Sequence, residues 1–217
     1  MKRLILASNI LPVNIQWQEG KYLIEKAEET TISGLQNFYQ GFEAQWVGLT
    51  SFENHEFNAK EIRSLDAALK PFNCVPIYPR PRDINLHHHG FSRNTLWPLF
   101  HYFTENVVYS EVSWKAYVKI NRLYAEKILS IIQDGDIIWV HDYHLLLVPQ
   151  MIREQRPDIS IGLFIHVPFP SFELFRLLPW RLEIIEGMLG ADLIGFQTYD
   201  YVRHFMSSVR RLRGVDS

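Results

Sequence analysis

The polar and aromatic side chains around Asp142 form the part of the sequence best suited to chemistry. Asp142 follows a short apolar run and is flanked by His141, Tyr143 and His144. A carboxylate in this position can accept hydrogen bonds from sugar hydroxyl groups, and an aromatic ring such as that of Tyr143 suits the apolar face of a sugar. The same carboxylate could instead cap a helix over residues 143–154. Spacing alone favours neither role.

Three apolar runs place further polar groups near Asp142. They cover residues 137–140, 161–165 and 193–196, and each passes into a helix-like pattern. Apolar runs without alternation are typical of strands buried on both faces, and strands that alternate with helices form a parallel sheet. Ligands bind beyond the carboxyl ends of such strands. The residues expected along that edge are His141, Asp142, His144, His166, Gln197 and Thr198.

The rest of the chain must supply the elements that position this edge. We expect one α/β domain in which residues 3–8, 136–140, 161–165 and 193–196 are strands of the same parallel sheet. Residues 110–132 predict one long helix with an apolar face. Other expected elements are a hairpin of residues 13–17 and 22–26 around Glu19 and Gly20, a helix over 35–39 capped by Ser33, strands over 45–49 and 73–78, a helix over 59–69 capped by Asn58, a loop over 79–82 and a last helix over 199–212.

Composition narrows the class of protein. Of the 217 residues, 47% are hydrophobic and 21% are charged, which suits one large α/β domain or at most two small ones. The formal net charge of −2 argues against a nucleic-acid surface. No apolar stretch reaches 18 residues, and the apolar run near the N-terminus is too short for a signal peptide. We therefore expect a cytoplasmic protein that does not span a membrane.

Several common chemical sites find little support. The sequence has no G-x-G-x-x-G, Walker, G-x-S-x-G or H-E-x-x-H motif. A zinc site at residues 87–89 or at His141 and His144 is disfavoured, because no cysteine or carboxylate cluster accompanies these histidines. A glycosidase pair would need a second acid near Asp142, and Glu173 is the only nearby candidate. A buried thiol is the favoured interpretation of Cys74, the single cysteine.

Four stretches carry a family resemblance. They read FSRNTLWPLFHY, DIIWVHDYHLLLVPQMIRE, IGLFIHVPFPSFELFRLLPWR and DLIGFQTYDYVRHF. In this order and spacing they resemble trehalose-6-phosphate synthase, a retaining glucosyltransferase of GT-B architecture with two Rossmann-like halves. The resemblance covers the whole chain, most specifically from Phe91 onward, and it matches the N-terminal half only. It implies that residues 1–217 are an acceptor-side domain whose C-terminal nucleotide-sugar domain is absent from this chain.

The resemblance also implies a reaction and the residues that serve it. The family moves glucose from UDP-glucose to glucose 6-phosphate with retention, without a metal or another cofactor. Asp142 falls at the family's acceptor-binding aspartate, with Tyr143 beside it, and Trp97 falls at the aromatic residue next to the acceptor. His166 falls at the histidine near the donor glucose. Ser33 and Gly34 fall at the glycine loop whose backbone approaches the donor diphosphate.

Four positions differ from the family pattern, at Ile10, Ser33, Leu49 and His88. Ile10 stands where the family has a phosphate-binding arginine, and His88 stands at a tyrosine that contacts the acceptor phosphate. The resemblance therefore leaves two alternatives beside the synthase: a non-catalytic regulatory homologue, and a transferase with a different acceptor. The expected partners are UDP-glucose, a sugar phosphate and the C-terminal half, with no nucleic acid. The sequence does not indicate whether the protein forms an oligomer.

Two further side-chain groups have competing interpretations. The last expected helix carries Arg203, Arg210, Arg211 and Arg213, and a solvated basic face is favoured over a phosphate site. His166 can be held by loop backbone without any ligand, or it can face a substrate. Only the positions of neighbouring groups can decide between these roles.

Overall fold

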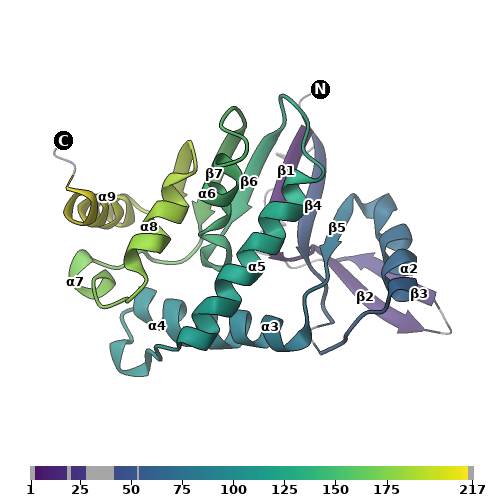
Figure 1. The fold of residues 1–217 in the computed structure, drawn as a ribbon, viewed down its shortest axis with the longest axis horizontal. Coiled ribbons are helices and arrows are strands. Elements are labelled where there is room, and N and C mark those ends of the chain that lie inside the picture. The colour runs from purple at the N-terminus through teal and green to yellow at the C-terminus, as the bar shows by residue number, and fades with distance from the viewer. Residues whose placement is uncertain (1–2, 19–20, 28–41, 53, 215–217) are drawn as a thin grey trace.

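The computed structural model describes residues 3–18, 21–27, 42–52 and 54–214 (Figure 1). Six parallel strands form its central sheet, in the order β5-β4-β1-β6-β7-β8. The strands are β1 (Arg3–Ile10), β4 (Glu43–Leu49), β5 (Cys74–Ile77), β6 (Ile137–His141), β7 (Ser160–Ile165) and β8 (Leu193–Phe196). All four segments predicted to share one parallel sheet do so, which confirms the expected α/β fold.

Helices connect these strands, and α5 crosses in front of the sheet in Figure 1. The helical elements are α2 (Ala59–Leu69), α3 (Pro81–Asn85), the π-helix η3 (Leu86–Leu96), α4 (Trp97–Phe100), α5 (Glu111–Leu129), α6 (Val148–Arg153), α7 (Phe172–Phe175), α8 (Arg181–Leu189) and α9 (Tyr199–Arg213); short 3₁₀ turns are η2 (Lys70–Phe72), η4 (Thr104–Asn106) and η5 (Tyr143–Leu145). The main core lies between the sheet and these helices, with Tyr117, Phe91 and Phe100 fully buried in it.

Local capping explains where two helices begin. The Asn58 side chain accepts hydrogen bonds from the backbone of Lys60 and Glu61, and Glu61 bonds back to the Asn58 backbone, which is a complete capping box. Ser110 accepts a bond from the Ser113 backbone at the start of α5. The predicted boundaries of both helices agree with the structure to within a few residues.

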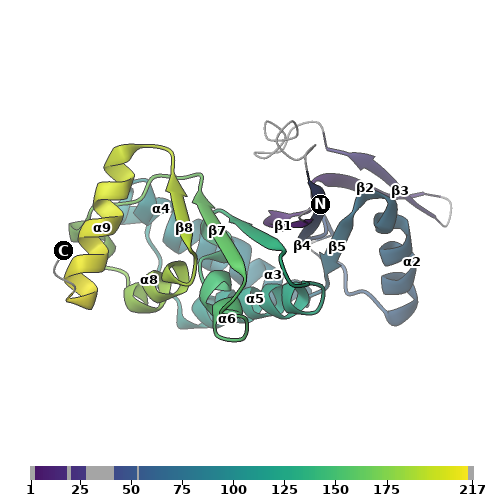
Figure 2. The ribbon, with the colours of Figure 1, turned by 90° about the horizontal axis from the view of Figure 1, so that it is seen from above.

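A smaller unit flanks the β5 end of the sheet. β2 (Val13–Gln18) and β3 (Lys21–Lys26) pair as an antiparallel hairpin, as predicted, and pack with α2 around Leu65 and Leu69. Seen from above, α2 and this hairpin lie at the opposite end of the molecule from α9 (Figure 2). Cys74 belongs to the same apolar cluster, and burial raises the pKa of its thiol to about 12. The thiol is therefore unreactive, which confirms the buried interpretation.

Three predicted segments need correction. The first strand continues to Ile10, because its backbone stays paired with β4 as far as Leu49. The segment predicted as a loop over 79–82 already contains the start of α3, which Pro81 opens at a first-turn position where proline is favoured. The helix predicted over 143–154 is instead the short turn η5 followed by α6.

Three other expectations fall outside the described residues. They are the turn at Glu19 and Gly20, the Ser33 cap and the helix over 35–39. Within the described part of the chain, no helix is both long enough and apolar enough to cross a bilayer.

Candidate functional site

Asp142 stands at the carboxyl end of β6 in an unusual backbone conformation. Its φ is 72°, a left-handed value that a residue with a Cβ rarely adopts. Its N–H donates to the carbonyl oxygen of Phe164 at 2.7 Å, and its carboxylate Oδ1 accepts from the N–H of His166 at 3.2 Å. These bonds to β7 hold the strained residue in place. Asp142 and His166 are therefore neighbours at one edge of the sheet, as predicted.

The Asp142 side chain does not cap the helical turn that follows it. No side-chain capping bond is present at the start of η5. The carboxylate Oδ2 lies 3.9 Å from Nδ1 of His144, and 23% of the side chain is exposed. The capping interpretation is therefore wrong, because the positive φ directs the carboxylate to β7 and His144 instead.

Histidines from four segments surround this carboxylate. Nδ1 of His141 lies 3.2 Å from Nε2 of His166, and the two rings stack at 5.4 Å. The ring of His144 stacks on that of His88 at 5.5 Å. Gln197, which follows β8, donates from Nε2 to the carbonyl oxygen of His166 at 2.8 Å. His141, Asp142, His144, His166 and Gln197 thus meet through direct contacts, whereas Thr198 is the residue that precedes α9 and its side chain does not cap that helix.

Burial decides the charge of this cluster. It raises the pKa of Asp142 to about 6, although bonds from the backbone of Tyr143 and His166 offset part of that rise. It lowers the pKa of His141 to about 3, with the nearby His166 adding to the effect, and it also lowers the pKa of His166. The pKa of His144 is lowered well below its usual range, chiefly by burial. At neutral pH the carboxylate of Asp142 is therefore ionised, and the imidazoles of His141, His144 and His166 are uncharged.

Three polar side chains on the buried face of α5 hold the edge in position. The Tyr117 hydroxyl donates to the carbonyl oxygen of Tyr143 at 2.8 Å and accepts from the N–H of Leu146 at 3.1 Å. The Asn121 amide donates to the carbonyl oxygen of His144 at 3.0 Å and accepts from the N–H of Leu147 at 3.1 Å. Both side chains replace the backbone bonds that the irregular segment after Asp142 lacks.

Tyr124, one turn further along α5, forms hydrogen bonds with the backbone of the neighbouring strands β1 and β4. Its hydroxyl lies 2.9 Å from the carbonyl oxygen of Ser8 and 2.8 Å from that of Asn9, and it accepts from the N–H of Leu49. Sequence reasoning noticed Tyr117 and Tyr124 only as part of an apolar face and missed Asn121. A polar residue on the apolar face of a long helix is the signal that could have identified it.

Of the acceptor-site candidates, His88 and Tyr143 lie at this edge. His88, from η3, has its Nδ1 3.1 Å from the amide nitrogen of Asn9, so β1 and η3 meet beside β6. Tyr143 is 9% exposed, and burial together with the Asp142 charge raises the pKa of its hydroxyl. Trp97 is 40% exposed on α4 and stacks on His101 at 4.2 Å. Ser33 and Gly34 lie outside the described residues.

Glu173 and the arginines of α9 were weaker candidates for a functional role, and most of them form ion pairs at the surface. Glu173 lies on α7, where it forms ion pairs with Arg176 and Arg211 at the surface. On α9, Arg203 pairs with Asp200, and Arg213 pairs with Glu186. Arg203, Arg211 and Arg213 thus form ion pairs at the surface, which agrees with the favoured interpretation of a solvated basic face.

Several buried polar atoms at the edge have no partner among the described residues. They are Asn9 Oδ1, His141 Nε2, His144 Nδ1 and both ring nitrogens of His87. Buried polar atoms usually find a partner in protein, water or ligand. No group of three or more His, Cys, Asp or Glu side chains in the described ranges is arranged to hold a metal ion. Hydroxyl groups of a ligand match these donors and acceptors.

A parallel sheet with its polar site beyond the carboxyl edge defines a Rossmann-like domain, of the kind that forms half of a GT-B glycosyltransferase. The family model "Glycosyltransferase family 20" matches residues 2–217. The chain therefore belongs to glycosyltransferase family 20.

Curated relatives and solved structures agree with this family. The chain is 44% identical to an alpha,alpha-trehalose-phosphate synthase [UDP-forming] of Emericella nidulans and 41% identical to one of Yarrowia lipolytica, with coverage of 98% and 100% of this chain and 43% and 47% of those proteins. The chain thus spans less than half the length of these relatives. It also resembles the solved N-terminal domain of a Candida albicans trehalose-6-phosphate phosphatase, at 35% identity and a TM-score of 0.80, covering 100% of this chain and 44% of that chain. A solved E. coli trehalose-6-phosphate protein bound with UDP-2-fluoro glucose is 27% identical, with a TM-score of 0.75. The match covers 97% of this chain and 43% of that chain.

Proposed function

We propose that this chain is the acceptor-side half of a retaining glucosyltransferase that transfers glucose from UDP-glucose to glucose 6-phosphate. The product is trehalose 6-phosphate. The observation that carries the proposal is the carboxylate of Asp142, held at a positive φ by β7 and surrounded by uncharged histidines. The names of the curated relatives support the same reaction.

In this proposal Asp142 accepts hydrogen bonds from hydroxyl groups of the acceptor sugar and fixes its orientation. Tyr143 and Trp97 contact the acceptor, and His88 contacts its phosphate. His166 lies against the donor glucose. Ser33 and Gly34 approach the donor diphosphate. The rate enhancement then comes from positioning and from stabilising charge on the leaving UDP, without a nucleophile from the protein.

The protein partner in this proposal is a C-terminal nucleotide-sugar domain. The curated relatives are more than twice as long as the matched region, which leaves room for such a domain. Residues 1–217 alone would then lack the groups that hold the diphosphate. We expect no release of UDP by the isolated chain and rapid release once the second half is present.

The decisive experiment measures trehalose 6-phosphate formation by the full-length protein from UDP-glucose and glucose 6-phosphate. Asp142→Asn removes the charge but keeps the shape, and we expect it to lower kcat/KM by about 100-fold or more. Because the pKa of Asp142 is about 6, parent activity should also fall as pH decreases through 6, and Asp142→Asn should lack this component. Asp200→Asn, at an exposed position on α9, is the matched control and should retain full activity. Full activity of Asp142→Asn would refute the assigned role.

A second function is favoured by one comparison. The chain resembles the N-terminal domain of a trehalose-6-phosphate phosphatase, and by the sequence resemblance Ile10 falls where the family has a phosphate-binding arginine. A synthase-like domain without transferase activity would fit both observations. Such a domain would release no UDP in the full-length protein and would give no product at any concentration of glucose 6-phosphate.

A further inference from the structure

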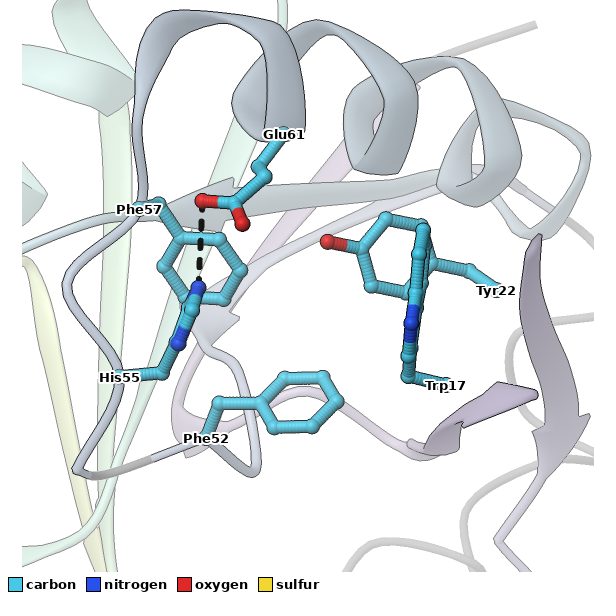
Figure 3. Close-up of a pocket in the computed structure, with 6 residues that line it drawn as sticks. All are labelled: Trp17, Tyr22, Phe52, His55, Phe57 and Glu61. Carbon is cyan, nitrogen blue, oxygen red and sulfur yellow. Dashed lines mark hydrogen bonds and ion pairs between the residues drawn. The ribbon is translucent and has the colours of Figure 1, made fainter. Parts of the chain in front are cut away.

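A second hollow, here called the aromatic pocket, lies between the β2–β3 hairpin and the start of α2 (Figure 3). Its volume is about 220 Å³, below the roughly 300–1,000 Å³ of sites for drug-sized ligands. The residues that line it are Trp17, Tyr22, Phe52, His55, Phe57 and Glu61. None of them belongs to the site around Asp142.

Aromatic rings form the walls of this pocket. Trp17 and Tyr22 meet at 4.6 Å with an interplanar angle of 62°, and Phe52 meets Phe57 at 5.9 Å and 73°. His55 stands at 84° to Phe57, with 4.6 Å between the ring centroids. Rings at such steep angles enclose a small space from several sides.

Among the described residues that line the pocket, Glu61 is the one carboxylate. Glu61 Oε2 accepts from the Asn58 N–H at 2.9 Å and lies 3.2 Å from Nε2 of His55. These contacts, with the backbone bond as the largest cause, lower the pKa of Glu61, so the carboxylate is ionised at neutral pH. In Figure 3 the Glu61 carboxylate and the Tyr22 hydroxyl both turn toward the enclosed space. The same charge, after burial, raises the pKa of Tyr22.

We propose that the aromatic pocket binds an organic ammonium group, either on a small molecule or on a methylated lysine side chain. The negative faces of aromatic rings attract a cation within about 6 Å of the ring centre, and a nearby carboxylate adds to this attraction. Among the described residues, no lysine or arginine lines the pocket, so these residues offer no cationic side chain of that kind to a sugar phosphate or a nucleotide. The pocket is therefore a site separate from the proposed transferase chemistry.

The test is an NMR titration of the full chain, observed through the backbone amide signals of Phe52, His55 and Phe57, which line the pocket. Choline and a trimethyllysine peptide are the two probes, and 3,3-dimethylbutanol is the neutral isostere of choline. We expect choline to bind at least about tenfold more tightly than the isostere, because the two have similar shapes and only choline carries the positive charge that the ring faces and Glu61 attract. A tighter interaction with the peptide than with choline would support a protein source of the ammonium group, and the reverse would support a small molecule.

Variants of the lining residues distinguish binding in the aromatic pocket from nonspecific binding. Trp17→Ala removes an exposed wall, and Glu61→Gln removes the charge while glutamine preserves the capping box. Each should weaken choline binding by about fivefold or more. Leu23→Ala, an exposed position on the same hairpin outside the pocket lining, is the matched control and should leave binding unchanged. Equal binding of choline and its isostere, or binding of glucose in place of either, would overturn the proposal.

Discussion

The edge around Asp142 and the aromatic pocket place polar groups in opposite surroundings. At the edge, buried side chains of α5 hydrogen-bond the backbone of the segment that follows a strained aspartate. In the pocket, 54% of Trp17 is exposed, and the one carboxylate is shared with a helix cap. The geometry of the edge therefore depends on packing in the core, whereas the geometry of the aromatic pocket depends on local structure at the periphery.

This difference changes what each region can do. Burial makes the histidines of the edge neutral and raises the pKa of its carboxylate, so the edge suits a hydroxylated, uncharged part of a ligand. The pocket keeps an ionised carboxylate beside ring faces, so it suits a cation. Changes at the edge should affect both stability and activity, and changes in the pocket should affect neither.

The largest expected effect comes from Asn121→Leu. Leucine has nearly the same volume but cannot pair with the carbonyl oxygen of His144 or the N–H of Leu147, and both would stay buried without a partner. We expect the free energy of unfolding to fall by about 2–4 kcal/mol. Urea denaturation of parent and variant measures this loss. A change below about 0.5 kcal/mol, which is typical of surface substitutions, would mean that water replaces the lost bonds.

The next effect is a dependence on pH. His87 is fully buried, and burial lowers the pKa of its imidazole from 6.5 to about 3. Its contribution to stability is therefore complete above pH 6.5 and is lost as the pH falls below that value. From pH 7 to pH 5 this loss should reach about 2 kcal/mol, and His87→Phe should abolish it. Asp142 acts in the opposite direction in both proteins, because its pKa is raised, so its effect cancels in the comparison.

Urea denaturation at the two pH values measures this difference. Trp17→Ala provides the control from the aromatic pocket, because tryptophan does not titrate and the variant should reproduce the parent's loss. If His87→Phe loses as much stability as the parent between pH 7 and pH 5, then another group accounts for the acid sensitivity.

A smaller effect is expected at Ile10. This side chain is 42% exposed at the end of β1, where an arginine can be accommodated. An arginine offers charge-assisted bonds to a phosphate, so Ile10→Arg should bind glucose 6-phosphate about tenfold more tightly. Isothermal titration of the full-length protein checks this, with Ile10→Gln as the uncharged control. Equal gains in both variants would show that charge is not the cause.

The smallest effect is expected in the aromatic pocket. Trp17→Ala removes an edge-to-face contact with Tyr22 at an exposed position, so the free energy of unfolding should change by less than about 1 kcal/mol. Binding of glucose 6-phosphate should not change at all. A larger loss of stability, or weaker binding of glucose 6-phosphate, would mean that the hairpin supports the edge around Asp142. The two regions would then not be independent.

The sequence by itself determined the parallel sheet, the long helix α5 and the adjacency of Asp142 and His166. Each follows from a local pattern: apolar runs that do not alternate, an apolar helical face, and polar residues directly after strands. The cap at Asn58 was likewise readable, because a capping box involves residues only three positions apart.

Other features depend on contacts between distant segments, and only the tertiary structure decided them. Asp142 was expected either to cap a helix or to bind a ligand, and the positive φ that rules out the cap is held by bonds to β7. Asn121 gained its role because α5 lies across the end of β6. The aromatic pocket joins residues 17 and 61, which a helix and a hairpin bring together. No periodicity encodes such contacts, because their energy arises only when the chain has folded and water has been excluded.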